Sequence, residues 1–322
     1  MPPRPATPGR PYPNIGQAIL LVVVAAALQA ATGATAYAIV AVARDDGQTT
    51  MSVVFNPWIL LPVVGVAGGL ALALGLRATH EPARRFFRVH PFSPRLIPAV
   101  IIGSLGLAVI LHEIDNGILE LVGRLAGPDK VVPDLIDVAV APVGAALLLM
   151  LAGPLIEEYL FRGMILRGLL ENTGRFTAIV VSAVLFGFIH GNLRQFVIGV
   201  TLGATFGWWY ERTRSVGPGL LGHAVFNSVT WVAGQLPAWG LALGLRRDKY
   251  PLVHEPWGFL LGGVVLAAVG FWDFARHASA VAPDRSWLPV APPEPPLLEP
   301  PPLLIAPGDQ AGPDTRAAAP VS

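Results

Sequence analysis

The chain has 322 residues and no cysteine, with 53% hydrophobic and 13% charged residues. Soluble domains carry about 25% charged residues, so this composition, with apolar runs long enough to cross a bilayer, predicts a polytopic membrane protein. The formal net charge of +1 indicates no nucleic-acid partner, and the bilayer itself is the expected environment. The lack of cysteine excludes disulfides, cysteine-ligated zinc and thiol nucleophiles.

The N-terminal part predicts an arm followed by three spans. Proline-rich residues 1–14 predict a disordered arm. Residues 15–134 predict transmembrane helices over Ile15–Ala43, Trp58–Leu76 and Leu96–Leu111, with a polar loop or partial helix after Leu111. Residues 77–95, rich in arginine and phenylalanine, predict a basic interfacial segment. A cleaved signal within residues 1–43 is the alternative, although the apolar run exceeds a signal core of roughly 7–15 residues.

The remaining chain predicts five more spans and a tail. Residues 135–245 predict a core of four spans over Leu135–Glu171, Phe176–His190, Gln195–Tyr210 and Pro218–Leu245. Residues 246–277 hold a C-terminal span, Trp257–Trp272, and residues 278–322 predict a disordered proline-rich tail. The expected fold is therefore an all-α bundle of about eight transmembrane helices with disordered proline-rich termini.

The distribution of basic residues predicts the orientation. With eight spans and the N-terminus inside, most of the 22 lysines and arginines fall in inside segments. The positive-inside rule then places both termini in the cytoplasm. We expect an integral protein of a bacterial cell membrane.

Three charged residues interrupt the apolar stretch Gly153–Arg167: Glu157, Glu158 and Arg162. Charges at membrane depth are expensive and are usually paired and functional. In a helix, Glu158 and Arg162 share a face at i,i+4 and can pair. Glu157 lies about 100° further around the axis and is available for chemistry. The paired arginine would orient the glutamates or receive a substrate carboxylate.

Two histidines and one asparagine lie in the later spans of the core. His190 ends one span, and His223 shares a helix face with Asn227 at i,i+4. A hydrogen bond to a neighbouring helix would account for any one of them alone. A hairpin turning near residues 172–174 would place Glu157 and His190 at one level, each about 24–25 Å from the turn.

These residue types indicate hydrolysis of an acyl bond. A carboxylate and an imidazole can deprotonate a water molecule. Alternatively, Glu157, His190 and His223 could ligate a divalent metal such as Zn²⁺. His223 and Asn227 can donate hydrogen bonds to an oxyanion. The residues leave both the glutamate and the metal mechanism open.

In this order the motifs resemble the CPBP family of intramembrane proteases, which includes the CAAX prenyl endopeptidases. The family pattern Glu-Glu-x-x-x-Arg, Phe-x-x-x-His and His-x-x-x-Asn is matched by Glu157–Arg162, Phe186–His190 and His223–Asn227. The resemblance covers roughly Leu135–Ala233. It implies a helical membrane core that cleaves peptide bonds in membrane-embedded or membrane-associated peptides or proteins.

The resemblance also implies roles. Glu157 with His190 would activate the water, and His223 with Asn227 would stabilise the oxyanion. Related proteins are thought to act on other membrane peptides or in peptide-toxin immunity, so CAAX cleavage does not carry over. The alternatives are a catalytically silent scaffold, or maturation or immunity partner, with the same fold, and a proton-coupled transporter. The complete motif set favours the enzyme.

Overall fold

A computed structural model describes residues 11–44, 55–79, 82–87, 90–127, 140–245 and 253–278. These residues form helices and connecting turns, without a strand among them, and all lie in the compact unit Gly9–Leu288. The all-α transmembrane bundle predicted from the sequence is confirmed. Most of the predicted arm, residues 1–10, and nearly all of the predicted tail, residues 279–322, lie outside the described residues.

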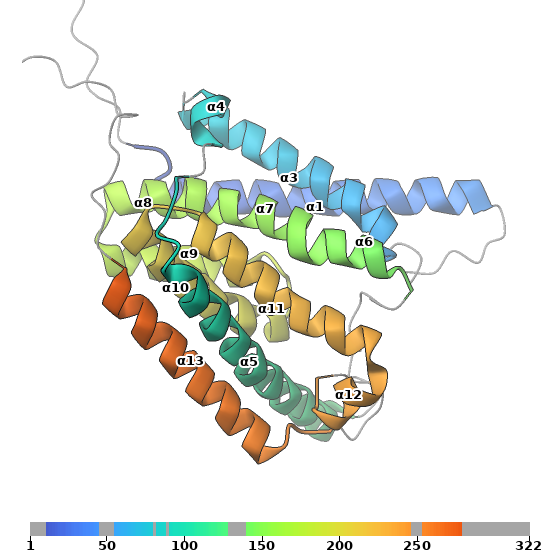
Figure 1. The fold of residues 1–322 in the computed structure, drawn as a ribbon. Coiled ribbons are helices and arrows are strands. Elements are labelled where there is room, and N and C mark those ends of the chain that lie inside the picture. Colours follow the sequence, from blue (N-terminus) through green and yellow to red (C-terminus); the bar gives the residue numbers. More distant parts are fainter. Residues whose placement is uncertain are drawn as a thin grey trace, which may run out of the picture. The chain divides into compact units, whose positions relative to one another are not determined.

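The helices follow one another in chain order in Figure 1. They are α1 (Ile15–Arg44), α3 (Pro57–Thr79), α4 (Ala83–Phe86), α5 (Leu96–Ala126), α6 (Pro142–Leu147), η2 (Leu148–Ala152), α7 (Gly153–Glu158), η3 (Tyr159–Leu166), α8 (Arg167–Asn172), α9 (Arg175–Phe188), α10 (Leu193–Thr213), α11 (Gly217–Gln235), α12 (Pro237–Ala242) and α13 (Trp257–His277).

Five helical stretches are long and apolar enough to cross a bilayer, judged by length and composition: α1, α3, α5, the run Pro142–Asn172 and α13. All eight predicted spans contain helix, but the other three fall short of this standard. Helix α9 has 14 residues, about 21 Å, against a hydrocarbon core of about 30 Å. Helices α10 and α11 carry the polar side chains of the core, which lowers their hydropathy.

The run Pro142–Asn172 is one helix with two wider π-helical turns, η2 and η3. In the first, the N–H of Gly153 donates to the carbonyl of Leu148, five residues back. In the second, the N–H of Arg167 donates to the carbonyl of Arg162, again five residues back. Such turns are rare and are often found at functional sites. Here they flank α7, which carries both glutamates.

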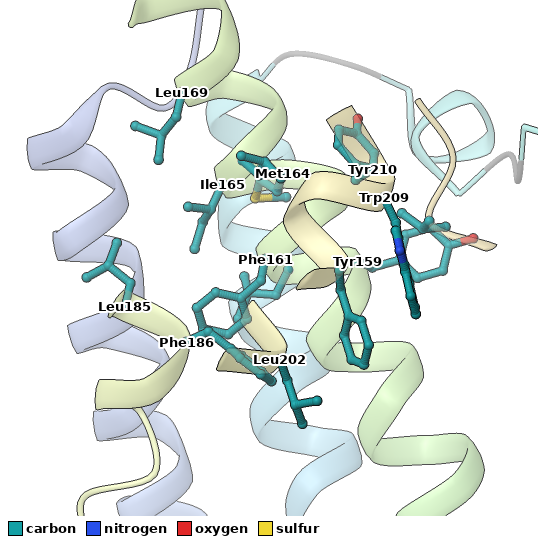
Figure 2. Packing of buried hydrophobic residues seen from close by; sticks show 14 of the residues in the cluster. Tyr159, Phe161, Met164, Ile165, Leu169, Leu185, Phe186, Leu202, Trp209 and Tyr210 are labelled. Atoms are coloured by element: carbon teal, nitrogen blue, oxygen red, sulfur yellow. The ribbon is translucent and has the colours of Figure 1, made fainter. Parts of the chain in front are cut away.

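The core is built around η3, all of whose residues are buried. Figure 2 shows Phe161 of η3 beside Phe186 of α9, with ring centroids 5.0 Å apart. Leu202 and Trp209 of α10 belong to the same buried cluster. The apolar packing of η3 therefore fixes the position of the arginine in its middle.

Small residues bring α9 and α10 into close contact. A Cβ added at Gly187 would lie 2.7 Å from the carbonyl oxygen of Phe196, and one added at Gly203 would lie 2.7 Å from the Cα of Ala183. Small residues at helix interfaces let two backbones approach in this way. The hairpin predicted from the sequence is confirmed, because α8 ends at Asn172 and α9 begins at Arg175.

The segments between the helices differ from expectation in two places. Residues 11–14, assigned by composition to the disordered arm, lie against α8: Nδ2 of Asn172 donates to the carbonyls of Pro11 (2.7 Å) and Pro13 (3.3 Å). The expected connection after Leu111 is helical as far as Ala126. Its polar residues are tolerated in this helix because several of them are buried against polar partners from α10, α11 and the segment before α13.

The predicted interfacial segment 77–95 contains the short helix α4 and lies across one end of the core. The hydroxyl of Tyr159 donates to the carbonyl of Phe87 at 3.0 Å. The hydroxyl of Ser215 donates to the carbonyl of His90 at 2.5 Å. Both contacts join this segment to helices of the predicted core.

Candidate active site

The two adjacent glutamates of α7 lie in different environments. The side chain of Glu158 is fully buried, whereas that of Glu157 is 31% exposed. Neighbouring residues of a helix point about 100° apart, which accounts for the difference. Glu157 is therefore the carboxylate that water and substrate can reach.

Arg162 neutralises the buried glutamate. Its Nη1 donates to Oε1 of Glu158 at 2.8 Å, which is the pair that the i,i+4 spacing predicts. Its Nη2 donates to the carbonyls of Leu202 (3.3 Å) and Gly203 (3.4 Å) on α10. The guanidinium also lies over two aromatic rings, at 4.6 and 5.3 Å from their centroids, those of Phe186 and Phe206. Arg162 is thus fixed on several sides and unavailable to a substrate carboxylate.

His223 bridges the two glutamates. Its Nδ1 lies 3.3 Å from Oε1 of Glu158, and its Nε2 lies 3.7 Å from Oε2 of Glu157. The ring is buried and packs against Phe186 and Phe206. A histidine in contact with two carboxylates is held in orientation and stabilised when it carries a proton.

Gly219 permits this approach of α11 to α7. A Cβ at this position would overlap the carboxylate of Glu158. Gly219 lies four residues before His223, on the same helix face. Sequence reasoning missed this residue, although a glycine one turn before a site histidine is a readable signal of close backbone approach.

His190 reaches the same cluster through an aromatic ring. Its Nδ1 donates to the carbonyl of Phe186 at 2.9 Å, so its Nε2 holds the lone pair. Its ring packs edge-on against the ring of Phe186, which also packs edge-on against His223. Phe186 is therefore the shared neighbour of both histidines, a role that its place in the motif did not predict.

Asn227, one turn after His223, donates from Nδ2 to the carbonyl of Leu149 at 2.7 Å. This carbonyl lies in the π-helical turn η2, where the residue five positions on is Pro154. Proline has no N–H to donate, so the carbonyl needs another donor, and Asn227 supplies it. One N–H of this side chain thus has a structural task.

Comparison with known proteins agrees with this arrangement. Residues 139–229 match the family described as "Type II CAAX prenyl endopeptidase Rce1-like". This segment belongs to the CPBP protease family. All six predicted site residues lie within the CPBP segment.

A curated relative covers part of the same ground. Over 78 residues the chain is 33% identical to the Bacillus subtilis (strain 168) protein described as "Putative membrane peptidase YdiL". The match covers 24% of this chain and 32% of that protein, so the chain spans about a third of the relative's length. No solved structure matches the chain. With its apolar helices, this CPBP protein is an integral membrane protein.

The predicted metal ligands of the CPBP segment do not form a metal site as arranged. Within the described residues, no three His, Asp or Glu side chains lie close enough together to hold an ion. Glu157 and His223 face each other, whereas His190 packs on the far partner they share with it, the ring of Phe186. Zinc sites in hydrolases need three converging protein ligands. We therefore derive no step through a metal.

Proposed function

We propose that this protein is an intramembrane peptidase that hydrolyses peptide bonds in membrane-embedded or membrane-associated peptides or proteins. The observation that carries the proposal is the bridge formed by His223 between a buried glutamate and an accessible one. The fixed Glu158 holds the imidazole, and Glu157 remains open to water. The membership of residues 139–229 in a protease family supports the same reaction.

Glu157 is proposed as the general base. Its carboxylate takes a proton from a water molecule while the water oxygen attacks the carbonyl carbon of the scissile peptide bond. The lone pair on Nε2 of His190 accepts the second hydrogen of this water and so directs the attack. The proton held by Glu157 then passes to the leaving nitrogen as the C–N bond breaks. The products are a carboxylic acid and an amine.

The tetrahedral intermediate needs donors for its oxyanion. Nε2–H of protonated His223 faces the Glu157 side of the site, while Nδ1–H remains on Glu158. Asn227 keeps a second N–H beyond the one that Leu149 accepts. Fixed donors of this kind contribute to catalysis because they need no reorganisation as charge develops.

The adjacent carboxylates offer a matched test. Glu157→Gln removes the base but keeps the size of an accessible side chain, so we expect kcat to fall by about 10²–10⁴-fold with unfolding unchanged. Glu158→Gln leaves Arg162 buried without its counter-charge, so we expect a loss of about 3–5 kcal/mol of stability. The measurements are peptide cleavage in liposomes and unfolding in mixed micelles. Normal cleavage by Glu157→Gln would refute the assigned base.

The substrate for that assay comes from the cell. Quantitative proteomics of membrane peptides from cells producing the wild type or Glu157→Gln should show fragments that appear with the wild type alone. The purified protein should then cut a synthetic peptide spanning that bond. Full rescue of a deletion phenotype by Glu157→Gln would favour the scaffold reading instead.

A further inference from the structure

Asp115 of α5 is a buried carboxylate outside the CPBP segment, with a side chain 4% exposed. Its counter-charge is Arg194 of α10. Nε of Arg194 donates to Oδ1 and Nη2 donates to Oδ2, each at 2.8 Å. A two-bond fork fixes the orientation of the guanidinium as well as its distance. The pair therefore joins the middle of α5 rigidly to the first turn of α10.

Arg194 lies four residues after His190, and the residues between them form a tight turn. Gly191 adopts a φ of +70°. Asn192 caps α10 by accepting the N–H of Gln195 at 2.9 Å. The amide of Asn192 also donates to the carbonyl of His190 at 3.1 Å. The backbone of His190 is thus tied to the first turn of α10.

His190 gains less support from the helix that precedes it. Helix α9 ends at Phe188. The N–H of His190 reaches the carbonyl of Gly187 at 3.4 Å, which is long for an N–H···O bond. The imidazole is oriented by the carbonyl of Phe186, but its place in space depends on the turn into α10.

We propose that Asp115 and Arg194 are positioning residues for His190. Their ion pair holds the start of α10 against α5, and through Asn192 it sets where the imidazole of His190 stands in the site. The inference rests on the proposed function, because it gives the pair a role in the same reaction. It also brings α5, which precedes the CPBP segment, into the working of the site.

The first test is kinetic. For Asp115→Asn we expect kcat to fall by about 10- to 100-fold, because small misplacement of a reacting group is costly, with KM within about threefold. Arg194→Lys keeps the charge but loses the fork; we expect the same direction of change, and this variant serves if Asp115→Asn fails to fold. The matched control is Glu120→Gln, which breaks the exposed pair with Arg124 (2.9 Å) on the same helix. It should leave both constants unchanged.

A double-mutant cycle separates positioning from a general effect. In the His190→Ala background, Asp115→Asn should have no further effect on the residual rate, because its target is already gone. An equal fractional loss in both backgrounds would overturn the inference.

The second readout needs no activity. In histidine-labelled protein, the imidazole NMR signal of His190, assigned with His190→Ala, should shift in Asp115→Asn and stay in place in Glu120→Gln. An unmoved signal would overturn the inference even if cleavage is lost. A shifted signal in a protein that cuts no membrane peptide would refute the proposed function and leave the positioning role standing.

Discussion

Gly219 determines how the site is assembled at the scale of single residues. The side chain of Glu158 fills the space that a Cβ at Gly219 would take. In return, Glu158 reaches both Arg162 and His223. One missing methyl group therefore lets a buried carboxylate bridge two cations of the site.

Gly219→Ala tests this dependence. The added methyl must push the carboxylate of Glu158 away from His223, and overpacking of this kind costs about 1–3 kcal/mol. We expect the cleavage rate to fall by about 100-fold, since the imidazole loses its orientation. Gly69→Ala on α3 is the control, because a Cβ there meets nothing within 4 Å. A fully active Gly219→Ala protein would show that the position of Glu158 does not matter.

The residue pairings were predictable in proportion to their separation along the chain. The Glu158–Arg162 pair follows from i,i+4 spacing within one helix. The contacts of His223 with both glutamates cross from α11 to α7, 65 residues apart for Glu158. The sequence predicted one site for these residues but paired Glu157 with His190, whereas the ion pair of Glu157 is with His223. Depth along a helix is readable from residue counts; rotation about it is not.

At the scale of helices, η2 connects Pro154 to Asn227. The proline removes a backbone donor and the asparagine supplies its replacement. The sequence carries both residues, yet the π-helical turn was not predicted, because its stability depends on a hydrogen bond from another helix.

Pro154→Ala combined with Asn227→Ala tests the connection. In the wild type, Asn227→Ala leaves the carbonyl of Leu149 without that donor and should cost about 1–3 kcal/mol of stability. With Pro154→Ala, the new N–H at residue 154 can bond this carbonyl, and the cost of Asn227→Ala should fall by about 1 kcal/mol. Unfolding in mixed micelles of the two single variants and the double variant measures this coupling. Strict additivity would contradict the connection.

The existence of the helices followed from the apolar runs, whereas their lengths did not. Helix α9 is short because turns at both of its ends belong to the site, one leading to α8 and the other carrying His190. Helix α5 is longer than its apolar run because His112 and Asp115 are buried against polar partners on other helices. Partners supplied by the tertiary structure are invisible to hydropathy.

At the scale of the whole molecule, one end of the described bundle gathers the arginines. The start of α1, the end of α3, α4, the start of α5, α8, the start of α9, the end of α10 and the end of α13 lie at this end by the antiparallel course of the helices. They carry Arg77, Arg84, Arg85, Arg95, Arg167, Arg175, Arg212, Arg214 and Arg276. The positive-inside rule predicts that this end faces the cytoplasm.

The lack of native cysteine makes that orientation measurable without background labelling. We expect Leu125→Cys, at an exposed position near the end of α5, to react with a membrane-impermeant maleimide in intact cells. Ala83→Cys on α4 should react after permeabilisation alone. The reverse pattern would invert the predicted topology.

The π-helical turn η3 gives the helix a spare residue. Adjacent residues of a helix differ in direction by about 100°, so deleting one residue from η3 would let α bonding resume and would rotate α7 by that amount against everything that follows. Rotation of this size is the angle that separates Glu157 from Glu158. The doubled glutamate and the widened turn together make the helix tolerant of a register slip, in which one carboxylate takes over the direction vacated by the other.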